Sequence, residues 1–134
     1  MNYVLSSQAR TVKSKVLPPE VLVYEPDLLF SSGIESAARR HGFDVKLTTT
    51  TTDLAESLNE KAPSVVVVNL DAVDTISTLS GLMGRQGCRF VGYYSHVNAR
   101  VAEDAKKVGF ETVLPRRAFV ARLNEILAMI KLSG

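Results

Sequence analysis

The sequence predicts an α/β fold, a doubly wound parallel sheet of five strands with five helices on its two faces. Three observations lead to this prediction. From Pro18 onward, short apolar runs alternate with amphipathic segments. The most apolar run, residues 65–68, is four valines, which is typical of a strand buried on both faces of a parallel sheet. Glycine or proline follows several amphipathic segments, where helices commonly end.

Five segments have the pattern of strands. The first, "VLVYE", is almost continuously apolar, whereas the second, "DVKLTT", alternates and is expected to be more exposed. The predicted strands are residues 21–25, 44–49, 64–69, 89–95 and 111–115. Because a helical segment follows each strand, right-handed crossovers make all five strands parallel.

The helices are predicted from their capping residues and apolar spacing. Asp27 caps the first helix, which runs to about Arg40, and Gly42 follows it. The next helix opens at Asp53 and ends before Pro63. A weaker helix after residue 74 is shortened by glycines, and the fourth covers residues 98–109. The last helix, residues 117–132, is expected to face the core with Phe119, Leu123, Ile126, Leu127 and Ile130.

Charge divides the 134-residue chain into a short extension and one domain. Residues 1–17 hold three basic side chains and no acid, which leaves 13 basic and 14 acidic residues for the rest. We therefore expect a flexible basic extension over residues 1–17 and a single domain over residues 18–134. Three charges are few for a nucleic-acid arm, so nucleic-acid binding is not the favoured function.

Composition also indicates a compartment. The single cysteine, Cys88, has no partner for an internal disulfide, and the N-terminus lacks the pattern of a signal peptide. The longest apolar runs are too short to cross a bilayer. These features predict a cytoplasmic protein that makes no contact with membranes.

Polar side chains stand where the predicted strands end. The first strand ends at Glu25, the third at Asn69, the fourth at Ser95, and Arg116 follows the fifth. In a doubly wound sheet, functional groups gather at the carboxyl ends of the strands. We therefore expect an acid, an amide, a hydroxyl and a guanidinium in one crevice.

The element order and these strand ends resemble the receiver domain of response regulators over about residues 20–132. The resemblance implies a flavodoxin-like, three-layer sandwich. In that family two adjacent acids follow the first strand, a phosphoacceptor aspartate ends the third, Thr or Ser ends the fourth, and Lys-Pro follows the fifth. The segments "VLVYEP", "PSVVVVN", "VGYYSH" and "GFETVLPRR" place at these positions, in order, Glu25, Pro26, Asn69, Ser95, Arg116 and Arg117.

The departures from the family have chemical consequences. An asparagine amide is a poor nucleophile, and Pro26 offers no side-chain oxygen to a metal. Glu25 and Arg116 have opposite charges, so an Arg–carboxylate pair could replace the metal, with Asn69 and Ser95 in the same network. We interpret the chain as a pseudo-receiver: a non-enzymatic signalling module without a cofactor, not phosphorylated by the usual aspartate–Mg²⁺ route.

Two alternatives remain open. Asp27 and Asp71 each lie two residues beyond the family positions, and with Glu25 they could form a displaced Mg²⁺ site or let Asp71 accept phosphate. The chain would then be an atypical single-domain response regulator. The commoner uses of aspartate are a helix cap at Asp27 and a solvated loop at Asp71. The second alternative is a nucleic-acid or small-ligand binding module.

The resemblance also implies an interaction face. In receivers, the fourth helix, fifth strand and fifth helix often bind a protein partner or a second copy. The residues expected on this face are Ala102, Ala105, Lys106, Phe110, Arg117 and Arg122.

Overall fold

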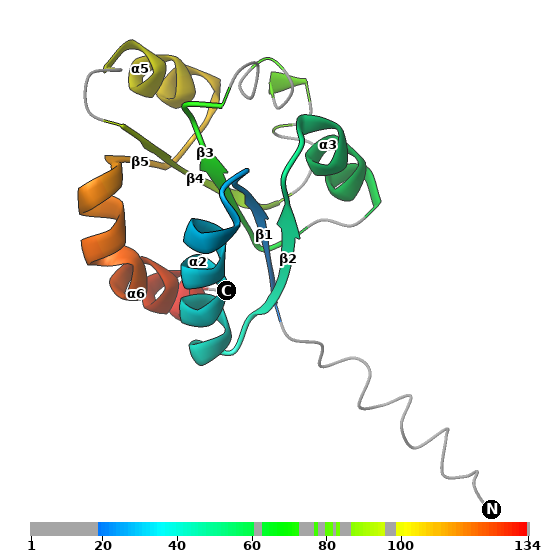
Figure 1. The fold of residues 1–134 in the computed structure, drawn as a ribbon, viewed down its shortest axis with the longest axis vertical. Coiled ribbons are helices and arrows are strands. Elements are labelled where there is room, and N and C mark those ends of the chain that lie inside the picture. The colour runs from blue at the N-terminus through cyan, green and yellow to red at the C-terminus, as the bar shows by residue number, and fades with distance from the viewer. Residues whose placement is uncertain are drawn as a thin grey trace, which may run out of the picture.

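The computed structural model describes residues 19–60, 63–72, 77, 80, 81, 83, 87–95 and 99–133. Along this part of the chain a helix follows each strand except β3, after which the next described element is β4 (Figure 1). The elements are β1 (Glu20–Tyr24), α2 (Leu28–Arg40), β2 (Asp44–Thr48), α3 (Thr51–Glu60), β3 (Val65–Asn69), β4 (Arg89–Tyr94), α5 (Ala99–Val108), β5 (Thr112–Pro115) and α6 (Arg116–Ser133).

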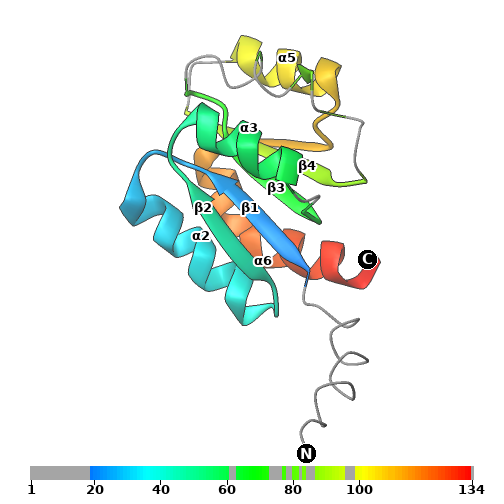
Figure 2. The same cartoon turned by 90° about the vertical axis from the view of Figure 1, so that its right-hand side faces the viewer.

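The five strands form one parallel sheet in the order β2-β1-β3-β4-β5. Helices α2 and α6 cover one face of the sheet, and α3 and α5 cover the other (Figure 2). This arrangement confirms the predicted doubly wound, flavodoxin-like sandwich. The valine strand β3 is central, which explains why its four valines are all buried.

Side chains along the inner strands point alternately to the two faces of the sheet, so they belong to two separate hydrophobic cores. On β1 and β3, Val21, Val23, Val65 and Val67 face α2 and α6. Their neighbours in sequence, Leu22, Val66 and Val68 among them, face α3 and α5. Because both faces are covered, both sets are apolar, and these strands lack a polar side. All five core residues predicted for the last helix are buried on α6.

The helix ends confirm three of the predicted boundaries. The Asp27 carboxylate accepts hydrogen bonds from the backbone N–H groups of Leu29 and Phe30, at 2.9 and 3.3 Å, and so caps α2. Gly42 and Gly109 have φ angles of 87° and 117°, in the left-handed region that favours glycine after a helix.

The predicted start of α3 at Asp53 is wrong. The helix begins at Thr51, because the Thr50 hydroxyl accepts the Asp53 backbone N–H at 3.1 Å and so provides the cap.

Four helices lie in the described residues. Most of the weaker helix predicted after residue 74, between β3 and β4, falls outside them. The basic extension over residues 1–17 and Asn98, the first residue predicted for the following helix, also fall outside them. Within the part of the chain that the structure describes, no helix has both the length and the apolar character needed to span a bilayer.

Gly92 on β4 is expected to be essential to packing. A Cβ atom there would lie 2.6 Å from Cδ1 and 2.9 Å from Cγ of Leu70, a buried side chain, whereas a Cβ at Gly33 on α2 would meet open space. Gly92→Ala should lower the free energy of unfolding by about 1–3 kcal/mol through overpacking. Gly33→Ala should raise it by about 0.5–1 kcal/mol through helix propensity. Urea unfolding of both variants tests the pair, and equal stability of the two would contradict the packing argument.

Candidate functional site

Three polar side chains occupy one row across the sheet at its carboxyl end. Tyr24 pairs with Val68 and Asn69 pairs with Tyr93, so Glu25, Asn69 and Tyr93 follow one another across β1, β3 and β4. Because side chains alternate along a strand, this row continues the sheet face that α2 and α6 cover. The register therefore brings together residues that are 44 and 68 positions apart in the sequence.

The Glu25 carboxylate is the centre of this row, and only 2% of the residue is exposed. Its Oε1 accepts hydrogen bonds from Asn69 Nδ2 at 3.0 Å and from the Tyr93 hydroxyl. Its Oε2 accepts the backbone N–H of Asp27 at 2.9 Å. A buried carboxylate is costly unless its oxygens are hydrogen-bonded, and here both are.

Asn69 links the buried carboxylate to the loop after β3. Its amide nitrogen donates to Glu25, and its Oδ1 accepts the backbone N–H of Asp71 at 2.9 Å. An aspartate at this position could not donate, and it would place a second negative charge beside Glu25. The amide therefore suits this site in a way that the acid of the receiver family would not.

The two displaced acids each have a local structural contact. Asp27 caps α2, and Asp71 Oδ2 accepts the backbone N–H of Ser95 at 2.7 Å, which joins the loop after β3 to the end of β4. Asp71 is exposed. Among the residues that the structure describes, no group of three or more His, Cys, Asp or Glu side chains is placed to hold a metal ion.

Arg116 does not form the expected pair with Glu25. Within the described residues the two side chains make no ion pair, and the Arg116 guanidinium lies 3.9 Å from the centroid of the Phe30 ring. Glu25 already has donors on both oxygens, whereas the face of Phe30 provides a cation–π site. The suggestion that this arginine replaces a metal as the partner of Glu25 is therefore wrong.

An aromatic cluster of Phe30, Tyr93 and Phe119 packs beside the buried carboxylate. The rings of Tyr93 and Phe119 are stacked with centroids 4.6 Å apart, and Phe30 lies 5.3 Å from Tyr93. Sequence reasoning did not include Tyr93 among the site residues and so missed its hydrogen bond to Glu25. The alternation of Tyr93 and Tyr94 showed that they face opposite layers, but only the register across β3 shows what Tyr93 reaches.

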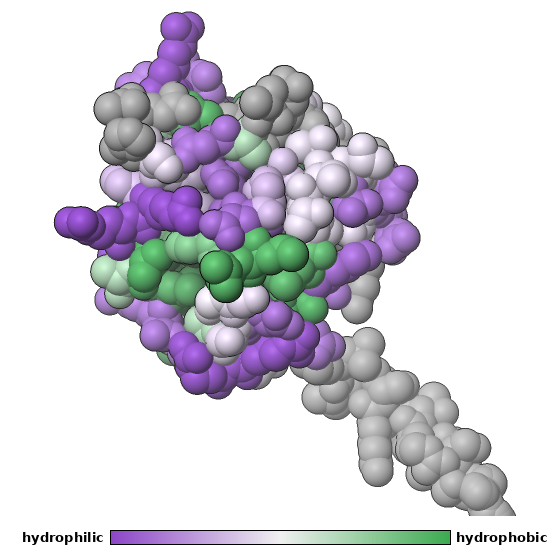
Figure 3. Space-filling model, in the orientation of Figure 1, coloured by the Kyte–Doolittle hydropathy of each residue, from purple (hydrophilic) through white to green (hydrophobic). Residues whose placement is uncertain are grey.

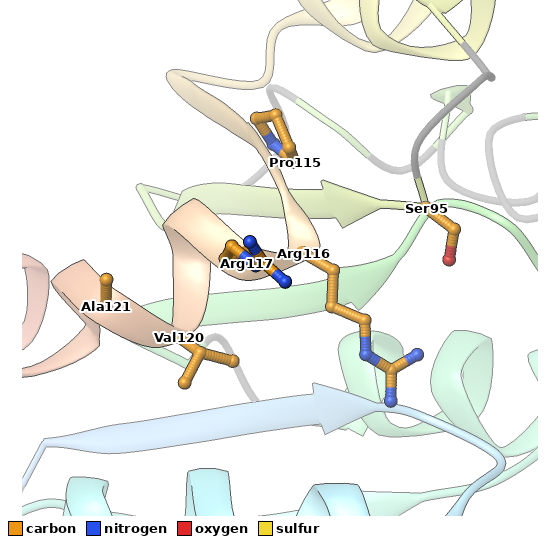
Figure 4. Close-up of a pocket in the computed structure, with 6 residues that line it drawn as sticks. All are labelled: Ser95, Pro115, Arg116, Arg117, Val120 and Ala121. Carbon is orange, nitrogen blue, oxygen red and sulfur yellow. The ribbon is translucent and has the colours of Figure 1, made fainter.

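Ser95 and Arg116 both line an open cavity of about 800 Å³ (Figure 4). Its other lining residues are Pro115, Arg117, Val120 and Ala121. The structure thus separates the predicted crevice into two parts. Glu25 and Asn69 belong to the buried row, whereas Ser95 and Arg116 border the open cavity.

Half of the predicted interaction face is not on the surface. Ala102, Ala105 and Phe110 are 7%, 0% and 4% exposed, so their assignment to a contact surface is wrong. Ala105 and Phe110 belong to the core between the sheet, α3 and α5, where Phe110 packs against Phe90. The charged members of the set, Lys106, Arg117 and Arg122, are exposed.

Tyr93→Phe should lower the free energy of unfolding by about 1.5–3 kcal/mol at pH 7, because it removes a donor from a buried carboxylate. Tyr94→Phe, on the half-buried neighbour, should cost no more than about 0.5 kcal/mol. Urea unfolding of both variants measures the difference. Similar costs for the two tyrosines would contradict the assigned role of Tyr93.

The loss of stability caused by Tyr93→Phe is expected to depend on pH. Burial raises the pKa of the Tyr93 hydroxyl well above its usual range, and the hydrogen bond to Glu25 raises it further. In the unfolded chain tyrosine ionises near pH 10, roughly. The stabilisation from Tyr93 is therefore complete below about pH 10 and decreases as the pH rises above it. Above about pH 10, the difference in the free energy of unfolding between wild type and Tyr93→Phe should therefore become smaller.

Comparison with known proteins relates this arrangement to one fold. No protein-family model and no curated protein matches the sequence. Among solved structures, a response regulator from Thermotoga maritima superposes with a TM-score of 0.73 at 15% identity, covering 85% of this chain and 98% of that chain. A CheY-like receiver domain from Methylobacillus flagellatus gives 0.71 at 18% identity, covering 85% and 99%.

An atypical orphan response regulator is also similar, with a TM-score of 0.66 at 17% identity, covering 82% of this chain and 95% of that chain. Identities this low establish a shared fold, and the roles of individual residues must come from the chemistry of the site. The chain has the fold of a response-regulator receiver domain.

Proposed function

We propose that this protein is a non-enzymatic regulatory module that acts by contact with another protein and takes up no phosphoryl group by the aspartate–Mg²⁺ route. One observation carries the proposal. At the strand end where receivers keep the phosphoacceptor, the Asn69 amide donates to the buried Glu25 carboxylate.

The chemistry of this strand end supports the proposal. Phosphoryl transfer to a protein needs an activated nucleophile and charge neutralisation around the transferred oxygens. The Asn69 nitrogen is a poor nucleophile, and it donates one of its two hydrogens to Glu25. Its oxygen is engaged by the backbone of Asp71. Neither the nitrogen nor the oxygen of Asn69 is therefore available to attack a phosphoryl group as a reactive carboxylate would.

The residues at the usual metal position do not fit Mg²⁺, which prefers an octahedral set of oxygen ligands. Both Glu25 oxygens accept hydrogen bonds from protein donors, and Pro26 has no side-chain oxygen. The Asp27 carboxylate points to the backbone of α2 as its cap. A cofactor-free module is therefore part of the proposal.

One solved structure of the same fold supports the proposal by analogy. The atypical orphan response regulator is described as having a phosphorylation-independent regulatory mechanism. Its similarity supports the view that this fold can regulate without phosphorylation. For this chain, the exposed basic side chains near β5 and α6 are the available contact groups, for a protein partner or a second copy.

Asp71 provides the competing proposal. It is the exposed acid nearest in sequence to the family position, and its carboxylate lies beside Ser95 at 2.7 Å from the backbone nitrogen. If Asp71 accepted a phosphoryl group, the chain would be an atypical response regulator. Uptake would disturb the hydrogen bond that joins the loop after β3 to β4, so we rank this proposal second.

Intact-mass spectrometry after incubation with acetyl phosphate and MgCl₂ distinguishes the two proposals. We expect no phosphoryl gain in the wild type under conditions that modify an active receiver domain run in parallel. Asp71→Asn is the matched variant. A gain in the wild type that Asp71→Asn abolishes would establish the competing proposal and overturn ours.

A further inference from the structure

An apolar groove lies between α2 and α6, beside the open cavity. The groove has a volume of about 260 Å³, and Val120 lines both the groove and the cavity, so the two hollows adjoin. The other groove residues are Leu29, Phe30, Gly33, Ile34, Ala37, Arg40, Phe119, Leu123 and Asn124. We call the two hollows together the α2–α6 surface.

Large apolar side chains are exposed on this surface. Leu29 is 87% exposed and Val120 is 54% exposed. Figure 3 shows a hydrophobic band across the region where Figure 1 places α2 and α6, with hydrophilic side chains above and below it. A contiguous apolar patch with a polar rim is typical of a surface that another molecule covers.

The charged side chains that line the two hollows are arginines. Arg116 and Arg117 open the 18-residue helix α6, where the positive end of the helix dipole disfavours cations. Neither they nor Arg40 forms an ion pair with another described residue, in contrast to Arg39 and Arg122, whose partners are Glu35 and Glu125. Among the residues that the structure describes, no acidic side chain lines either hollow.

We propose that the α2–α6 surface binds an acidic, amphipathic segment of a partner protein. Its apolar side chains cover Leu29 and Val120, and its carboxylates pair with Arg116 and Arg117. This inference rests on the proposed function, because it names the chemistry of the protein contact. It depends on the Arg116–Arg117 pair, where the receiver family has Lys-Pro.

Two other occupants fit less well. The acidic surface of a second copy, formed by Asp53, Glu56 and Glu60 on α3, carries no large exposed apolar side chain within the described residues. It could therefore satisfy the arginines but not the groove. An anionic bilayer could satisfy the charge, but a flat lipid surface does not fill a concave groove.

The test is an NMR titration of the full chain with a synthetic helical peptide that has leucines three and four positions apart and glutamates between them. Matched peptides replace glutamate by lysine or leucine by serine. We expect saturable shifts at residues lining the two hollows with the first peptide only. Arg116→Glu/Arg117→Glu and Leu29→Ser should each weaken binding about tenfold, which corresponds to about 1.4 kcal/mol. Lys107→Glu, an exposed charge reversal on α5, should leave the affinity unchanged.

Several outcomes would overturn the inference. These are absence of saturable shifts, equal binding of the lysine peptide, or shifts centred on α3 or α5. Co-sedimentation with phosphatidylserine vesicles that Arg116→Glu/Arg117→Glu abolishes, without peptide binding, would assign the surface to a membrane. Concentration-dependent self-association lost in the same variant would assign it to a second copy. The phosphoryl mass measurement is independent, so a failed titration without phosphoryl uptake removes this inference and leaves the proposed function standing.

Discussion

The buried carboxylate of Glu25 is the constraint on which the carboxyl end of the sheet depends. A carboxylate that is 2% exposed must replace the water it has lost, and its three donors come from three places: the backbone before α2, Asn69 on β3 and Tyr93 on β4. The Glu25 side chain thus links the end of β1 to both β3 and β4 by hydrogen bonds. It also holds the backbone of Asp27, just before α2 begins. Loss of any donor would leave the carboxylate buried with fewer partners, which costs more than the bond itself contributes.

The aromatic cluster connects the buried Glu25 carboxylate to the surface of the protein. Because Tyr93 extends toward Glu25, its ring lies between sheet and helices, where Phe30 and Phe119 pack against it. The Arg116 guanidinium in turn lies over the Phe30 ring. Arg116 occupies the position of the lysine that serves the phosphorylation site in receivers. Here it contributes its charge to a basic surface instead. The hydrogen bonds that hold the Glu25 carboxylate and the surface proposed for a partner are thus two results of one arrangement.

The interaction face shows where sequence reasoning was insufficient. Ala102, Ala105 and Lys106 are neighbours on α5, but the two alanines face the core and the lysine faces solvent. Small residues suit a helix–sheet contact as well as a protein interface, so their size does not decide between the two. The predicted start of α3 at Asp53 was wrong for a similar reason, since any of the five preceding threonines is able to cap a helix and only the geometry selects Thr50.

Local sequence patterns were enough to predict the α/β order, the central valine strand, the cap at Asp27 and the set of residues at the strand ends. These are consequences of periodicity, burial and capping, which are properties of short segments. Only the tertiary structure decided that Glu25 is held by Tyr93 and Asn69, while Arg116 lies on Phe30. That choice depends on the register of strands far apart in the chain and on competition for two carboxylate oxygens, and neither is encoded within a short segment.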